Sequence, residues 1–149
     1  MSYIFSLEVL LDYKKRLENE ARLLFVEAQS KVDAAIVVLG EYYDQVDRTR
    51  EQNSILQAQG GALAPSLVAN SDFITGQKFR IEAQRLKIRE LKTTADELHE
   101  AMIEAAKETK TLEKLKERGF EQYKRDRRKR EMKQQDELTT LRHKPNGGA

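Results

Sequence analysis

The chain has 149 residues, of which 35% are charged and 39% are hydrophobic, and its formal net charge is +2. Its seven glycines and two prolines are too few for the turns of a β-sandwich or an open α/β sheet, and its lack of cysteine excludes disulfides and thiolate metal sites. The longest apolar run, residues 34–39, is far shorter than the ~20 residues of a membrane span, and we expect no signal peptide. This composition is typical of long helices in a coiled coil.

A first long helix is predicted from about residues 2–6 to about Ala58. Its apolar stripe recurs in steps of three and four, which is typical of a helix that buries one narrow face against another helix. We assign to this stripe Leu7, Leu10, Lys14, Leu17, Ala21, Leu24, Ala28, Val32, Ala35, Leu39, Tyr42 and Val46. Two successive steps of four, from Leu24 to Val32, predict a local unwinding of the supercoil.

A connector is predicted at about residues 59–71, because Gly60, Gly61 and Pro65 oppose continuation of a helix. A second helix is predicted from about Asp72 to about Arg142, followed by a disordered tail at 143–149. Its stripe comprises Ile74, Gln77, Ile81, Gln84, Ile88, Leu91, Ala95, Leu98, Met102, Ala105, Thr109 and Leu112. The polar residues on the two stripes, namely Lys14, Gln77, Gln84 and Thr109, are expected to fix the register rather than to perform chemistry.

Neither helix can bury its stripe alone. We therefore predict an all-α fold in which residues 1–142 form a single domain, a long antiparallel two-helix coiled coil, or α-hairpin. With the predicted connector, residue i would lie opposite about residue 130 − i. A parallel dimer acting as a purely structural rod is the alternative.

Residues 34–39 are apolar in every direction around a helix, so a second apolar surface is expected beside the stripe, continuing into Tyr42 and Tyr43. Either the connector residues Leu63, Leu67 and Val68 fold back over this surface, or a partner protein binds it through the aromatic side chains.

Basic residues are concentrated between Lys114 and Lys133, where ten lysines and arginines accompany four acidic residues. A solvated helix, a protein-binding helix and a nucleic-acid-binding helix all fit this pattern. The acidic residues lie three or four positions from the basic ones, and the basic stretch follows the heptads, whereas it precedes them in zipper transcription factors. We therefore expect no nucleic-acid partner, although a nucleic-acid-binding coiled coil is kept as the alternative function.

Features of an enzyme are lacking in the sequence. His99 and His143 are isolated from each other, and the glycine pair at 60–61 is not followed by the lysine of a phosphate-binding loop. A two-helix rod also offers no enclosed pocket. We therefore expect no enzymatic activity, no metal and no cofactor.

Three segments share their pattern with one protein family. They contain Phe5, Leu7, Leu10, Leu11 and Lys14 near the start, Phe73, Ile74 and Gln84 in the second helix, and the run 110–137 with EKLKE at 113–117, Tyr123, Glu131, Asp136 and Glu137. In this combination the chain resembles the FliJ family, the coiled-coil proteins of the flagellar type III export apparatus.

The resemblance implies an antiparallel coiled coil similar to the rotor stalk of rotary ATPases. It implies binding to the ring of the export ATPase (FliI), contact with the membrane export gate (FlhA) and escort of export chaperones. It also implies a monomer in the cytoplasm, peripheral to the inner face of the cell membrane at the flagellar base. The equivalent stalk protein of virulence type III secretion systems is an alternative.

Two sets of contact residues are expected for these two partners. The gate contact is assigned to residues near the connector, Leu39, Tyr42, Tyr43 and Phe73. The ATPase-ring contact is assigned, from charge alone, to Arg125, Arg127, Arg128, Lys129 and Arg130.

Overall fold

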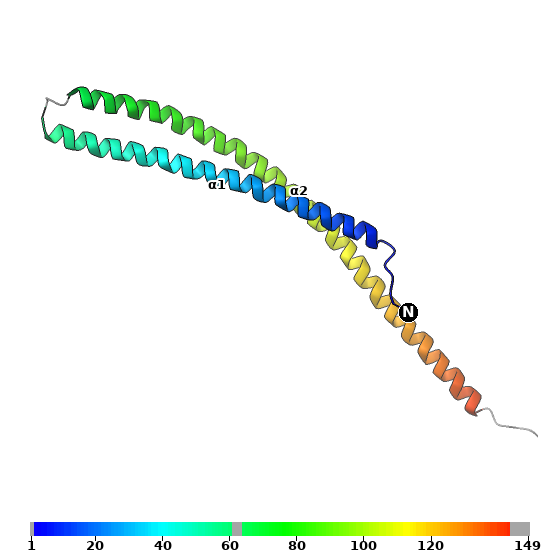
Figure 1. Ribbon diagram of the computed structural model, residues 1–149. Coiled ribbons are helices and arrows are strands. Elements are labelled where there is room, and N and C mark those ends of the chain that lie inside the picture. Colours follow the sequence, from blue (N-terminus) through cyan, green and yellow to red (C-terminus); the bar gives the residue numbers. More distant parts are fainter. Residues whose placement is uncertain (1, 61–63, 144–149) are drawn as a thin grey trace, which may run out of the picture. The chain divides into compact units, whose positions relative to one another are not determined.

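The computed structural model describes residues 2–60 and 64–143. Almost all of these residues belong to two helices, α1 (Glu8–Ala58) and α2 (Ala64–His143), and no strand occurs among them. The helices pack against each other as an antiparallel α-hairpin, which confirms the predicted fold class. The chain divides into two compact units: a terminal unit (Met1–Glu18 with Glu104–Ala149) and a hairpin unit (Asn19–Ile103). In the hairpin unit, the cyan part of α1 and the green part of α2 run side by side from the connector (Figure 1).

The predicted connector begins correctly but ends too late in the sequence, because α2 begins earlier than predicted. α1 ends at Ala58 as predicted, and Gly60 follows with a φ of 96°, a left-handed conformation that glycine adopts without steric cost. α2 begins at Ala64 rather than at Asp72, because Pro65 lies in the first turn, where its missing N–H removes no helical hydrogen bond. Residues 61–63, including Leu63, lie outside the described residues. Of the predicted disordered tail, His143 is the last residue of α2, and 144–149 also lie outside them.

The shorter connector changes the register by about one heptad. In the hairpin unit, the rings of Phe25 and His99 are 4.8 Å apart and Asn70 donates a 2.9 Å hydrogen bond to Asn53. Residue i therefore faces about residue 123 − i, not 130 − i. Within the terminal unit, Lys14 pairs with Glu108 in agreement with the same rule.

The buried stripe of α1 is more regular than predicted. Phe25 is half-buried whereas Leu24 is 52% exposed, and Leu11 is buried whereas Leu10 is exposed. The stripe therefore alternates steps of three and four without interruption, and the predicted local unwinding is wrong because it depended on Leu24. Its members are all buried or half-buried: Leu11, Lys14, Glu18, Ala21, Phe25, Ala28, Val32, Ala35, Leu39, Tyr42, Val46, Thr49, Asn53 and Leu56.

The stripe of α2 is confirmed, since each predicted position from Ile74 to Leu112 is buried or half-buried. Beyond Leu112 it continues in step through half-buried Lys116, Gly119, Tyr123 and Asp126. The core of the hairpin unit consists of Ala28, Val32 and Ala95, with Leu91 and Leu98 packed against them.

Much apolar surface is left outside the core. Leu67 and Val68 belong to the first turns of α2, so they do not fold back over residues 34–39 as one interpretation of the sequence required. Ile36 and Val37 are accordingly 47% and 61% exposed. No helix in the described part of the chain has the length and hydropathy needed to cross a membrane.

Candidate partner-binding surfaces

Polar side chains on the stripes bond across the helix interface. Gln77 is fully buried; it donates a hydrogen bond to Gln45 and accepts one of 2.9 Å from Arg80. Lys14 forms a 2.8 Å ion pair with Glu108. Thr109 differs, because its hydroxyl bonds only to the carbonyl of Ala105 in its own helix. Since a buried amide without a partner is costly, the bond between Gln77 and Gln45 selects this register over others.

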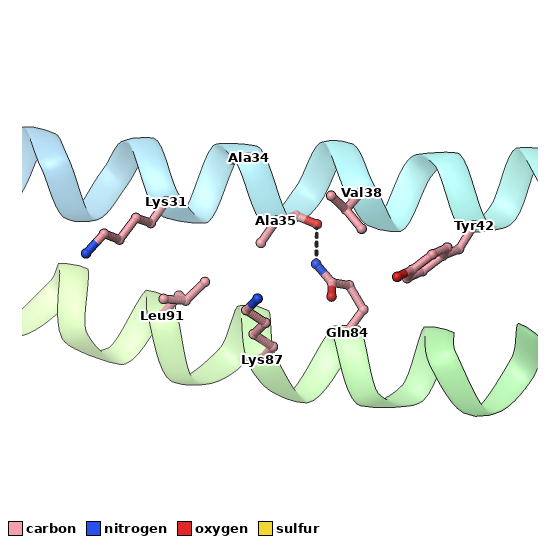
Figure 2. A pocket seen from close by; sticks show the side chains of 8 residues that line it. All are labelled: Lys31, Ala34, Ala35, Val38, Tyr42, Gln84, Lys87 and Leu91. Carbon is pink, nitrogen blue, oxygen red and sulfur yellow. Dashed lines mark hydrogen bonds between the residues drawn. The ribbon is translucent and has the colours of Figure 1, made fainter.

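A groove of about 410 Å³ follows one side of the interface in the hairpin unit, and we call it the Tyr42 groove. Figure 2 shows Gln84 reaching across it to donate a 2.9 Å hydrogen bond to the carbonyl oxygen of Ala35, beside the ring of Tyr42. Apart from Gln84, the floor of the groove consists of apolar side chains, and two lysines lie at its edges. Its lining residues are Lys31, Ala34, Ala35, Val38, Tyr42, Gln84, Lys87 and Leu91.

A second groove, the Leu39 groove, follows the other side of the same interface. It consists of two adjoining hollows of about 450 and 260 Å³, both lined by Arg85. One hollow is lined by Tyr43, Val46, Asp47, Arg50, Lys78, Ile81, Glu82 and Arg85, and the other by Leu39, Arg85, Ile88, Arg89 and Lys92.

The four residues assigned to the gate contact are divided between these surfaces. Tyr42 lines the first groove, whereas Leu39 and Tyr43 line the second. Phe73 is 39% exposed and lies two heptads before Lys87, so helical periodicity places it on the Tyr42 side. The assigned gate contact thus includes residues on both sides of the helix interface.

The five basic residues assigned to the ATPase ring are all exposed on α2 in the terminal unit. Arg127 forms a 3.2 Å ion pair with Glu131 one turn later. The other four cations, Arg125, Arg128, Lys129 and Arg130, have no ion-pair partner among the described residues. Because α2 turns by about 100° per residue, these five side chains point in all directions around the helix.

The terminal unit also holds an aromatic cluster that the sequence did not reveal. The ring of Tyr3 lies 5.7 Å from the rings of both Phe120 and Tyr123, and Lys124 lies 4.5 Å above the ring of Phe120. This cluster is possible because α2 has a glycine at position 119: a Cβ atom there would come within 2.1 Å of the Tyr3 hydroxyl oxygen. A glycine inside a helix often marks such a close approach, and this signal was available in the sequence.

Two ion pairs join the segments of the terminal unit. Lys116 contacts Glu8 at 2.9 Å, in addition to the pair between Lys14 and Glu108. The hydrogen bond that Lys116 donates to Glu8 raises the pKa of the Lys116 amine above its usual value, and the charges of Glu8 and Asp12 act in the same direction. Lys116 is thus protonated at neutral pH.

A comparison with models of known protein families identifies the family of the chain. A model of the flagellar FliJ protein family matches residues 3–148, which is nearly the whole chain. The chain belongs to the FliJ family. The curated proteins and the solved structures compared with it gave no match. Membership makes the chain a component of the flagellar export apparatus, in a family of non-enzymatic proteins.

We also searched this FliJ-family chain for clusters of side chains that could bind a metal ion. Within residues 2–60 and 64–143, no three histidine, cysteine or acidic side chains are placed to hold a metal ion. His99 packs against Phe25 as part of the helix interface. The candidate surfaces are therefore the two grooves and the basic part of α2.

The role of Gly119 can be tested against a second helical glycine. Gly119→Ala should gain up to about 1 kcal/mol of helix propensity, but the new methyl group should displace Tyr3, so we expect little net change in the free energy of unfolding. Gly76→Ala, where nothing lies within 4 Å, should gain the full amount.

Urea denaturation measures both changes, and chymotrypsin cleavage near Tyr3 reports whether the N-terminal segment has been released. We expect faster cleavage in Gly119→Ala and unchanged cleavage in Gly76→Ala. Equal stabilisation by both substitutions, with equal cleavage rates, would show that Tyr3 does not depend on the glycine.

Proposed function

We propose that this FliJ-family chain is a non-enzymatic stalk that binds the ring of the flagellar export ATPase through its terminal unit. The hairpin unit would contact the export gate, and the protein would escort export chaperones. It would act as a cytoplasmic monomer, held at the inner face of the cell membrane at the flagellar base by its partners. The observation that carries this proposal is the set of unpaired cations around the exposed end of α2.

The distribution of these cations supports a ring rather than a flat partner. Beyond Lys116, which pairs with Glu8, α2 continues to His143, and all of its residues from 127 to 143 are exposed. The unpaired Arg125, Arg128 and Lys129 share one face, whereas the unpaired Arg130 lies on the other, beside Arg127, which pairs with Glu131. A flat surface could use one of these faces, whereas the centre of a ring surrounds the helix and can place acidic groups against both.

Surface chemistry also supports a gate contact on the Tyr42 side of the hairpin unit. Tyr42 and Phe73 are aromatic, and the register places them about 12 Å apart along the interface, within reach of one partner segment. Aromatic side chains at the edge of an apolar groove are typical anchors of protein interfaces.

The proposal is tested by titrating the purified export ATPase of the same organism with this chain. We expect stimulation of ATP hydrolysis that saturates at one chain per ATPase ring. The absence of both stimulation and a complex on a sizing column would refute the proposed stalk function.

The gate contact gives a separate prediction. Tyr42→Ala combined with Phe73→Ala should weaken binding to the cytoplasmic part of the export gate by about tenfold or more, because interface aromatic residues often contribute 1–2 kcal/mol each. Isothermal titration calorimetry measures this change. Phe79→Ala is the matched control, since Phe79 is an aromatic residue of α2 that is 74% exposed and lines neither groove. An equal loss in the control would mean that the Tyr42 side has no special role.

A further inference from the structure

The Leu39 groove carries more positive charge than its own acidic residues neutralise. Five basic side chains line it, and the acidic side chains are Asp47 and Glu82. Glu82 forms a 3.4 Å ion pair with Arg85. The other basic residues, Arg50, Lys78, Arg89 and Lys92, have no ion-pair partner in the part of the chain that the structure describes.

The four basic residues that α2 contributes to the groove form a ladder along its α2 side. Lys78, Arg85 and Lys92 recur every seven residues on α2, and Arg89 lies one turn after Arg85, so all four share one side of the helix. From Lys78 to Lys92 the ladder advances by fourteen positions, or about 21 Å of helix.

The floor between the banks is apolar and belongs to both helices. Ile81 and Ile88 of α2 lie beside Leu39, Tyr43 and Val46 of α1, and Tyr43 is 41% exposed. A groove between two packed helices, with apolar residues at steps of three, four and seven, accepts the apolar stripe of a third helix. Nucleic acid would use the cations but would gain little from an aliphatic floor.

We propose that the Leu39 groove binds an amphipathic helix of a partner protein that carries acidic residues along one flank. The apolar face of this helix would cover Leu39, Tyr43 and Ile88, and its acidic flank would face Arg85, Arg89 and Lys92. A local three-helix bundle would result, with the ladder selecting a partner by charge. The site is distinct from the Tyr42 side, where the proposed gate contact lies. It includes Leu39 and Tyr43, which the resemblance had assigned to the gate, and it adds a partner to the proposed stalk function.

The test uses the full chain and two labelled, helix-stapled peptides with leucines at steps of three and four. One peptide has glutamates along the flank, and its matched partner has lysines at the same positions. Fluorescence anisotropy should show binding of the glutamate peptide, which weakens as salt rises, and much weaker binding of the lysine peptide.

The triple substitution Arg85→Gln, Arg89→Gln and Lys92→Gln should weaken binding of the glutamate peptide about tenfold, because each exposed ion pair changes an equilibrium by a factor of about 1.5 to 5. Tyr43→Asp should weaken it as well by adding negative charge to the floor. The control variant removes three charges elsewhere in the hairpin unit, through Lys31→Gln, Arg48→Gln and Lys87→Gln, and should bind as the wild type does.

Three results would overturn the proposal: equal binding of the two peptides, an equal loss in the control variant, or unchanged binding by the triple variant. Tighter binding of duplex DNA than of the glutamate peptide, lost in the same triple variant, would assign the groove to nucleic acid instead. Stimulation of the export ATPase by the triple variant should equal that of the wild type. If the wild type itself fails to stimulate the ATPase, the stalk function fails while the groove result stands.

Discussion

Replacing Arg127, Arg128, Lys129 and Arg130 by glutamine is expected to weaken binding to the export ATPase ring by about tenfold or more and to abolish stimulation at equal concentrations. Each exposed charge contributes a factor of about 1.5 to 5 to such an equilibrium, so four together have a large effect. The same charges steer association, and the loss should therefore be greatest at low salt. Affinity and ATP hydrolysis are measured in parallel over a series of salt concentrations.

The helix itself should survive this change, because all four side chains are exposed and glutamine is a good helix former. Circular dichroism checks that the helix content is intact. The triple variant at Arg85, Arg89 and Lys92 is the matched control, since it also removes exposed charges from α2 but in the hairpin unit. If ring binding is unchanged in the quadruple variant, the basic end of α2 has no part in the mechanism.

Val32→Asp is expected to unfold much of the hairpin unit. Val32 is 1% exposed and lies in the core cluster with Ala28 and Ala95, so the substitution places a carboxylate where it has neither water nor a cation. Substitutions that bury an unpaired charge typically cost about 3–5 kcal/mol, which is a large share of the stability of a small protein.

Val37 provides a control with the same chemistry and the opposite exposure. It lies five residues later in α1 and is 61% exposed, so Val37→Asp should change the free energy of unfolding by no more than about 0.5 kcal/mol. Urea denaturation followed by circular dichroism measures both variants. Comparable losses in the two would mean that the stripe through Val32 is not the buried face of α1.

Local sequence chemistry determined where α1 ends and how α2 packs. The glycine at position 60 is compatible with the left-handed turn that ends α1, and the stripe from Ile74 to Leu112 was predicted position by position. Here the steps of three and four run unbroken from Ile74 to Leu112, so periodicity identifies the buried face even though Gln77 and Gln84 are polar.

Periodicity was misleading where adjacent apolar residues offered two choices. Leu10 and Leu11, and Leu24 and Phe25, fit a helical stripe almost equally well, and the buried member is decided by what lies opposite, as the contact of Phe25 with His99 shows. The start of α2 was predicted too late because Pro65 was taken as a helix breaker. In the first turn of a helix, proline removes no helical hydrogen bond and is compatible with the helix.

The sequence by itself determined the fold class, the helix partners and the family, because heptad spacing and the paucity of turn residues leave few other folds. The tertiary structure decided the register of the two helices and, with it, which residues line each of the two grooves. One heptad of shift changes which residues of α2 lie opposite Leu39, Tyr42 and Tyr43, so the lining of each groove depends on pairing across the interface. The docking of Tyr3 on Gly119 likewise joins residues far apart in the chain, which no local pattern can specify.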